Sequence, residues 1–588
     1  MFRKSYIIQL LCIVLCAVTL VDGRALFAPY LLAAIYALYC LGQNCDSSLP
    51  GKKAMRYIVM ASVLSGAFIT LANYGLWLHP AMPDIRSSLF VRICKLSLIL
   101  IIFLGSFCSV FNILVHTVVR QSAGFTVPGR LPETKRPYLY FVIPFVIFSG
   151  IYLTVYACCY YPGLLSLDSL DQIGQIFTGE YSNHQPFYHT MMISFFVRSA
   201  LMLGAGINTA VSFYITVQVL FVAATFAFTI CNMAKLEIPV WCEICACVCY
   251  ALLPYHIMFS FTMWKDVYFA AFVTLLITFY VRLVKGMGKA VINYIGFGIS
   301  GLFVCLIRSN GLFAYVFVLA FVFLLARRQK KILFIMAATV CVSFVLKHAV
   351  LSAMNVTPPD TVESLSIPLQ QIARVITDNG TVAEEDRAFL SNIIDVDSIP
   401  EIYNPDISDP VKNAIRDFGN QQFLSENLAG FAKMYLRTFV HNPTEYVIAW
   451  VDSTCGYWNS GYEYWIWYWD VEENEYGISR SIASEGMLHA MDEYLWLFYN
   501  NRILQVFCAV GFVSWIVLLI LAVNIASANR TGIITVIPVL AIMLSLVISS
   551  PVYSEFRYMY AAFTSLPIIA AASFTKVCDR KDNNGGSL

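Results

Sequence analysis

Residues 311–331 read GLFAYVFVLAFVFLLARRQKK, an apolar run of 16 residues that four basic side chains close. A helix of about 20 apolar residues crosses the ~30 Å hydrocarbon core of a bilayer. Lys and Arg concentrate in the cytoplasmic loops of membrane proteins. The stretch therefore predicts a membrane-spanning helix whose C-terminal end, at Arg327, lies in the cytoplasm.

The composition of the whole chain agrees with this prediction. Of its 588 residues 59% are hydrophobic and 13% are charged, whereas soluble domains carry about 25% charged residues. Runs of this kind recur along the chain, and together they predict an all-α polytopic membrane protein with about 14 transmembrane helices. They lie at about 6–21, 26–43, 57–78, 91–116, 138–159, 209–231, 239–259, 267–284, 290–307, 311–326, 332–350, 503–524, 533–549 and 557–575.

One segment between these runs is rich in acidic residues and poor in basic ones. Residues 351–500 carry 23 of the 36 carboxylates but only 7 of the 38 Lys and Arg residues. A segment so poor in basic residues is expected on the outer face. We predict an extracytoplasmic, mostly helical domain inserted before the last three helices. The predicted divisions are an N-terminal four-helix extension (1–137), a transmembrane core with an outer loop at 160–206 (138–350), the acidic domain (351–500), and a three-helix segment with a cytoplasmic tail (501–588).

The same charge rule orients the rest of the chain. With Arg3 and Lys4 inside, both termini are cytoplasmic and nearly every basic cluster falls on that side. The first run is alternatively a signal peptide, which leaves the later orientation unchanged. The short stretch 188–203 is predicted to be an amphipathic helix on the outer surface. The acidic domain holds a single cysteine, Cys455, so it has no internal disulfide. This fits a surface domain of a bacterial cytoplasmic membrane better than a eukaryotic secreted domain.

Two aspartates follow the fifth run in YPGLLSLDSLDQ, residues 161–172. Pro162 ends the preceding helix, and Ser166 is expected to cap a new one. Asp168 and Asp171 are three residues apart and share a face of that helix. They could hold a divalent cation such as Mg²⁺ or Mn²⁺, or one could act as a general base. The alternative is a capped surface helix with solvated acids.

Further charged groups are predicted on the same outer face. Lys265 is the only Lys or Arg between Lys235 and Arg282, and it could bind a phosphate; Asp266 beside it could merely cap a helix. Arg308 precedes a tight Asn-Gly turn that does not itself require an arginine. Ionisable groups near bilayer depth usually mark a site or a mutual pairing. The last outer loop adds a possible ion pair, Glu555 and Arg557.

Residues 456–469, GYWNSGYEYWIWYW, are dense in aromatic side chains. Such rings are typical of the membrane interface, and they also stack on sugar rings and bases. The chain has no P-loop, nucleophile elbow, zincin or dinucleotide-binding motif, which argues against ATP-driven transport and familiar hydrolase chemistry. No basic cluster on a soluble module supports nucleic-acid binding.

Taken together, these motifs resemble the GT-C superfamily of membrane glycosyltransferases that use polyprenyl-phosphate-linked sugars. The resemblance spans about Tyr138 to Pro567 and rests on the order of the motifs. It is closest to a bacterial branch near the dolichyl-phosphate-mannose-protein-mannosyltransferase-like families. Its motifs are Tyr161-Pro-Gly with Asp168, His184-Gln-Pro186, Trp264-Lys-Asp266, Arg308-Ser-Asn-Gly311, Cys455-Gly-Tyr-Trp458 and Arg557-Tyr558.

The resemblance implies transfer of a sugar from a polyprenyl-phosphate donor to an extracytoplasmic glycan, lipid or protein acceptor. Asp168 would take the proton from the acceptor hydroxyl, while basic residues neutralise the leaving phosphate. The implied catalytic residues are Asp168, Asp171 and Asp266; the phosphate-binding residues are Lys265, Arg308 and Arg557; and the substrate-binding residues are His184, Asn310, Glu555 and Tyr558.

Two other functions remain open on the sequence. In a transporter or flippase for a lipid-linked glycan, the same charges would form a translocation path, although transporter sites lie near the bilayer midplane. In a scaffold, the acidic domain would bind a partner, which leaves Lys265 and Arg308 without a role.

Overall fold

The computed structural model describes residues 138–574, except 237, 239, 459–461, 463, 527–528 and 550–551. The predicted four-helix extension, the signal-peptide alternative and the cytoplasmic tail lie outside these residues. Within them the chain is helical, and its only strand-like pairs are isolated bridges.

Six helices in this part of the chain are long and apolar enough to cross a membrane. A bent pair, α10 (Val240–Leu252) and α11 (Pro254–Ser260), gives a further candidate that turns by 54°. Pro254 begins α11, and a proline cannot continue the helix before it because it lacks an N–H and clashes with the preceding turn. The six are α6 (Leu139–Cys159), α9 (Ile207–Lys235), α12 (Lys265–Lys285), α13 (Ala290–Ile307), the helix Lys330–Ala353 formed by α15 (Lys330–Val345), η1 (Leu346–Val350) and α16 (Leu351–Ala353), and α27 (Arg530–Ile548).

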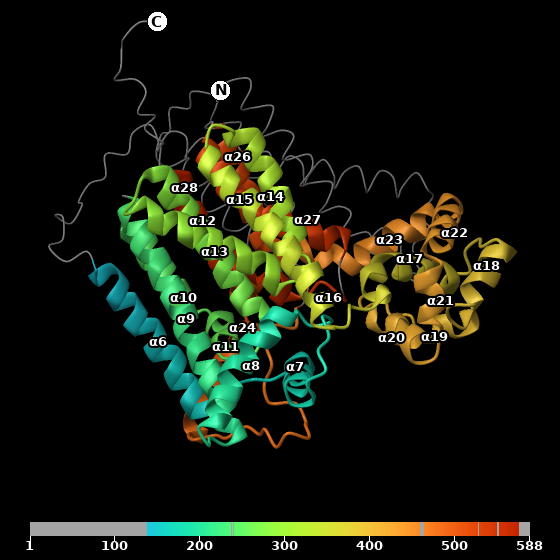
Figure 1. Cartoon of the computed structure of the whole chain (residues 1–588), viewed down its shortest axis with the longest axis horizontal. Coiled ribbons are helices and arrows are strands. Elements are labelled where there is room, and N and C mark those ends of the chain that lie inside the picture. Colours follow the sequence, from blue (N-terminus) through green and yellow to red (C-terminus); the bar gives the residue numbers. More distant parts are fainter. Residues whose placement is uncertain are drawn as a thin grey trace, which may run out of the picture.

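These helices form a bundle (Figure 1) whose centre is α12, which packs against α9, α13 and α28 (Tyr560–Phe574). The helix α14 (Gly311–Ala326) packs against α27, and α26 (Val510–Ala526) lies beside α27 and α28. Most of the predicted runs in the described region coincide with single helices, but the runs at 239–259 and 503–524 are each divided between shorter helices. The described part of the chain is all-helical, and its apolar helices indicate a multi-pass membrane protein.

Two short helices lie across one end of the bundle (Figure 1). They are α7 (Leu167–Thr178) and α8 (Phe187–Met202). The stretch that the sequence assigned to a surface helix is α8, which buries one face, including His189 and Ile193, and exposes Phe195 and Met202.

A separate helical domain projects from one side of the bundle (Figure 1). It has its own apolar core, whose residues lie between Val362 and Tyr446. Ser408 N–H donates to Val552 O at 3.0 Å and Trp450 Nε1–H donates to Val547 O at 2.9 Å, so both bonds tie the domain to the bundle. Its elements are η2 (Thr361–Leu365), α17 (Ser366–Thr377), α18 (Glu384–Ser391), η3 (Val396–Ser398), α19 (Ile399–Ile402), α20 (Asp409–Asp417), α21 (Gln421–Glu426), α22 (Leu428–His441) and α23 (Pro443–Thr454).

The predicted acidic domain, 351–500, is longer than this second core. Its last part returns to the bundle: Trp458 and Trp467 belong to the main core, and Tyr494 on α24 (Glu485–Asn500) donates to Leu252 O. Three short helices, η4 (Cys455–Tyr457), α25 (Arg502–Gln505) and η5 (Val506–Cys508), connect this segment to its neighbours. The aromatic stretch therefore packs on the bundle and not in the projecting domain.

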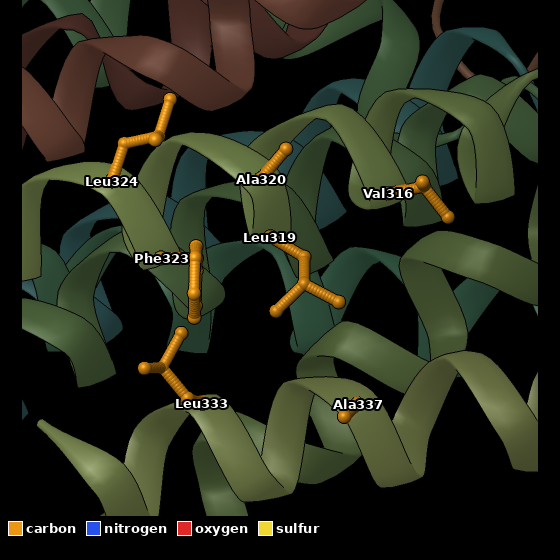
Figure 2. A pocket seen from close by; sticks show the side chains of 7 residues that line it. All are labelled: Val316, Leu319, Ala320, Phe323, Leu324, Leu333 and Ala337. Carbon is orange, nitrogen blue, oxygen red and sulfur yellow. The ribbon is translucent and has the colours of Figure 1, made fainter. Parts of the chain in front are cut away.

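Between α14 and α15 lies an apolar groove of about 540 Å³ (Figure 2). Its lining has no ionisable or amide side chain, so it offers no group for acid–base chemistry. The lining residues are Val316, Leu319, Ala320, Phe323, Leu324, Leu333 and Ala337.

Candidate active site at the end of the bundle

A tight turn brings the start of α7 onto the beginning of α12. Gly163 adopts φ +130°, and a Cβ there would lie 2.7 Å from Ile215 Cγ1, so the turn requires glycine. Leu164 then pairs with residues 261–263: its N–H donates to Phe261 O at 3.0 Å and its O accepts from Met263 N–H at 2.9 Å. This pairing fixes the positions of Asp168 and of the first residues of α12 relative to each other.

Ser166 occupies the N-cap position of α7, but its side chain makes no capping hydrogen bond. Its hydroxyl accepts from Trp264 Nε1–H at 2.9 Å instead. The predicted N-cap position of Ser166 is therefore confirmed, but its side chain does not cap the helix, because the buried indole N–H of Trp264 requires a partner. Ser169 makes a second link to the same segment, donating to Met263 O at 2.6 Å.

Three side chains hold the carboxylate of Asp168, which lies in the first turn of α7. Arg557 Nη1 lies 2.9 Å from Oδ2, and Lys265 Nζ lies 3.7 Å from the same oxygen. Gln185 donates Nε2–H to Oδ1 at 3.0 Å, and its Oε1 accepts from Lys265. The Asp168 side chain keeps 32% of its area exposed, so a substrate can approach it.

The charges around Asp168 favour its ionised form. Burial alone would raise the pKa of this carboxyl group, but Lys265 and Arg557 hold the pKa well below its usual range. A carboxylate with a lowered pKa stabilises the folded state above the unfolded-state pKa of about 3.9, and this contribution is lost as the pH falls. At neutral pH Asp168 is therefore an anion held between two cations.

Asp266 and Arg308 form a second, buried pair. Arg308 Nη1 lies 2.5 Å from Asp266 Oδ1, and both side chains are almost fully buried. The guanidinium also lies over the rings of Tyr558 and Phe269, at 4.7 Å and 5.5 Å from their centroids. Asp266 Oδ2 accepts no hydrogen bond from the described residues. This pair links the beginning of α12 to the end of α13.

The last outer loop supplies the remaining charges through η6 (Phe556–Met559). Arg557 Nε lies 2.5 Å from Glu555 Oε1, so its guanidinium bridges Glu555 and Asp168. Its Cζ lies over the rings of Trp264 and Tyr558, at 4.9 Å and 5.4 Å. Burial raises the pKa of Glu555, and Arg557 opposes that shift.

A buried polar network anchors α7 on α8 and α9. Gln172 donates to Thr190 Oγ1 at 2.8 Å, and its Oε1 lies 3.0 Å from His189 Nδ1. His189 Nε2 lies 2.8 Å from the hydroxyl of Tyr214. Burial lowers the pKa of His189 to about 3, so the imidazole is neutral. The network satisfies these buried groups and orients the helix that carries Asp168.

The structure thus brings seven of the ten predicted site residues into one cluster, which we call the charged cluster. Sequence reasoning missed Gln185, although it named the two residues that flank it. It also missed Lys347, whose Nζ donates to Arg308 O at 3.1 Å; its place near the end of an apolar run was the available signal. The seven are Asp168, Lys265, Asp266, Arg308, Glu555, Arg557 and Tyr558.

The other three predicted residues lie differently. Asp171 is exposed, and its carboxylate accepts from Gln175 of its own helix at 3.0 Å. His184 is exposed beside the charged cluster and influences Asp168 electrostatically. Asn310 donates to Ser545 Oγ at 2.8 Å and so links α14 to α27.

The three aspartates of the predicted catalytic set do not form a metal-binding group. Asp171 is exposed and accepts from Gln175 of its own helix, while Asp168 and Asp266 are each paired with an arginine. Among the described residues no set of three or more His, Cys, Asp or Glu side chains is arranged to hold a metal ion. We therefore assign no step to a metal.

The profile of one protein family, described as "Family of unknown function (DUF6020)", matches residues 178–585, more than half of the chain. The chain belongs to the DUF6020 family. No curated protein and no solved structure matches it. The DUF6020 match includes Lys265, Asp266, Arg308 and Arg557 of the charged cluster, and it begins after Asp168.

Proposed function

We propose that this protein is a GT-C-type membrane glycosyltransferase that moves a sugar from a polyprenyl-phosphate donor to an extracytoplasmic glycan, lipid or protein acceptor. One observation carries the proposal: the partly exposed carboxylate of Asp168 lies between Lys265 and Arg557. A base for the acceptor hydroxyl and cations for the leaving phosphate thus share one site at the end of a bundle of apolar helices.

The formal charges of the site suit a single phosphodiester. The charged cluster has three cations and three carboxylates, and Lys347, which donates to Arg308 O at its edge, adds one positive charge that a monoanionic polyprenyl phosphate carrying a sugar would balance. Buried charges require compensation of this kind because an unpaired ion is poorly solvated there. The cations of the cluster are Lys265, Arg308 and Arg557, and the carboxylates are Asp168, Asp266 and Glu555.

Donor binding would also prepare Asp168 for its role. A general base works best when its pKa is near the operating pH, whereas the two cations hold the pKa of Asp168 low. A phosphodiester that shares Lys265 and Arg557 offsets their charge and returns the pKa of Asp168 towards its ordinary value.

In the transfer step, Asp168 accepts the proton of the acceptor hydroxyl while the oxygen of that hydroxyl forms a bond to the anomeric carbon of the donor sugar. The bond from that carbon to the phosphate oxygen breaks, and polyprenyl phosphate leaves beside Lys265 and Arg557. In this conformation Arg308 contributes its charge without contacting the phosphate, because its guanidinium is paired with Asp266. Its direct binding to phosphate stays a prediction.

The proposal is tested with the full-length protein in proteoliposomes that contain a polyprenyl phosphate carrying a radiolabelled sugar. Membrane extracts supply acceptors, and we expect labelled product together with released polyprenyl phosphate. If the labelled donor instead crosses the bilayer intact, the protein is a transporter. The position of the charged cluster at helix ends favours transfer, because transporter sites lie near the bilayer midplane.

The Arg557→Lys variant is expected to transfer sugar about tenfold more slowly than the unchanged protein. Arg557 contacts Asp168 and Glu555 through two different nitrogens, and a lysine cannot reproduce this fork although it keeps the charge. The measurement is the initial transfer rate at saturating acceptor. An unchanged rate would remove Arg557 from the phosphate site.

For the topology, we propose fourteen crossings in the bacterial cytoplasmic membrane, with both termini cytoplasmic and residues 351–500 outside. An impermeant thiol reagent on intact cells is then expected to label Asp171→Cys and Glu473→Cys, both exposed positions, above the level of the unmodified chain. Arg328→Cys, also exposed but on the basic side, is the matched control and should label only after permeabilisation. The reverse pattern would invert the orientation.

A further inference from the structure

The aromatic segment after the projecting domain runs alongside the turn that precedes α7, the helix that carries Asp168. Glu472 N–H donates to Leu165 O at 3.0 Å, and Leu165 pairs with Val471 in a short parallel bridge. Three residues earlier, Tyr468 packs edge-to-face on Trp264, with ring centroids 5.6 Å apart. The aromatic side chains are therefore fixed at the edge of the charged cluster by backbone pairing as well as by ring packing.

Trp465, Tyr468 and Trp264 form a continuous aromatic wall. Trp465 meets Tyr468 edge-to-face at 4.6 Å and lies 6.2 Å from Trp264. On its other side Trp264 stacks under the guanidinium of Arg557, which holds Asp168. The wall thus extends directly from the groups that are proposed to bind phosphate and remove a proton.

Most rings of this segment are accounted for by burial, but Trp465 is not. Trp458 and Trp467 are about 1% exposed and belong to the main core, whereas Trp465 keeps 37% of its surface exposed. Because Trp465 contacts Trp264 and Tyr468 at the edge of the charged cluster, its exposed surface is open to a ligand there. The electron-rich face of an indole attracts C–H groups that carry partial positive charge, and these line the apolar face of a sugar ring.

We propose that Trp465 and Tyr468 form a platform at the edge of the charged cluster, in which a sugar ring stacks on the indole of Trp465 and Tyr468 borders it. This inference rests on the proposed function and specifies where its sugar lies. The sugar can be the one on the donor or one on the acceptor, because the same C–H face is offered by both. The platform orients the ring, while the phosphate is bound separately by Lys265 and Arg557.

The test measures binding to the detergent-purified full-length protein by calorimetry. The probes are a short-chain polyprenyl phosphate, the same lipid carrying one hexose, and a free methyl hexoside. Trp465→Ala is expected to weaken binding of a sugar-bearing probe roughly five- to tenfold and to leave the bare lipid phosphate unaffected. Trp465→Phe keeps a ring face and should restore most of the loss.

Trp496→Ala is the matched control. Trp496 is 53% exposed, and its ring contacts are with Trp469 and Tyr499, outside the wall. Its variant should bind all three probes like the unchanged protein. Melting temperatures equal to that of the unchanged protein exclude misfolding as the cause.

Which probe responds identifies the source of the sugar. A loss with the hexose-bearing lipid assigns the platform to the donor, and a loss with the methyl hexoside alone assigns it to the acceptor. The platform is overturned if the unchanged protein and Trp465→Ala bind every sugar-bearing probe with equal affinity. The same conclusion follows if neither protein binds these probes measurably. Failure of the bare lipid phosphate to bind counts against the proposed donor site instead, while the methyl hexoside still tests the platform.

Discussion

Asp168→Asn is expected to abolish sugar transfer almost completely while the protein accumulates normally in the membrane. Asparagine keeps the shape of the side chain but cannot accept the proton of the acceptor hydroxyl, and loss of a general base typically costs ~10²–10⁴ in rate. The loss of the ion pairs to Lys265 and Arg557 should lower stability, but the protein should still fold, because the Asp168 side chain is 32% exposed and Arg557 retains Glu555 as a partner. The measurement is the initial rate of transfer by purified protein, normalised to the amount that folds.

Asp171→Asn on the same helix distinguishes the loss of a single general base from the loss of a shared metal site. Asp171 is exposed and bonded only within α7 by the contacts described, so a single base at Asp168 predicts a rate near that of the unchanged protein. Equal losses at both positions would point to a shared metal site, against the geometry. Transfer by Asp168→Asn at the unmutated rate would end the catalytic assignment and favour transport.

Arg308→Ala is expected to produce the largest loss of stability, about 3–5 kcal/mol in the free energy of unfolding. The substitution leaves Asp266 as a buried carboxylate without a counter-ion, and neither oxygen then has a charged partner. It also removes the guanidinium from the rings of Tyr558 and Phe269. Thermal unfolding in detergent, followed by size-exclusion chromatography, measures the effect.

An exposed ion pair of the same length provides the control. Arg387 Nη2 lies 2.5 Å from Asp397 Oδ1 in the projecting domain, and both side chains are about half or more exposed. Arg387→Ala should cost less than about 1 kcal/mol, because water screens and solvates such pairs. The double change Asp266→Asn with Arg308→Met should be less harmful than Arg308→Ala alone. Equal losses for Arg308→Ala and Arg387→Ala would show that the Asp266 charge is not buried in solution.

The helices of the bundle could be predicted from the sequence because each depends on local composition. The run at 290–307 matches α13 residue for residue, and the run at 311–326 matches α14. The break between α10 and α11 at Pro254 is also a local event, although the run at 239–259 was predicted as one helix. The extent of the projecting domain was harder to predict, since charge counts do not show that residues 457–498 pack on the bundle.

The charged cluster was partly predictable for a different reason. Asp168, Lys265, Arg308 and Arg557 are unusual beside apolar runs, so each was identified, and the charge rule placed all four on one face. Gln185 was missed because an uncharged amide beside a proline gives no such signal. Asp171 was included because a spacing of three residues does not show which carboxylate faces the cluster.

The sequence by itself determined that the chain is helical and membrane-embedded, because burial of apolar side chains and satisfaction of backbone groups in lipid depend on composition over short windows. Only the tertiary structure decided which charges are partners. Asp266 pairs with Arg308, and Asp168 with Arg557, across separations of 42 and 389 residues. Such pairs depend on how helices cross and where loops fold back, and Coulomb attraction over a few ångströms leaves no periodic pattern in the chain.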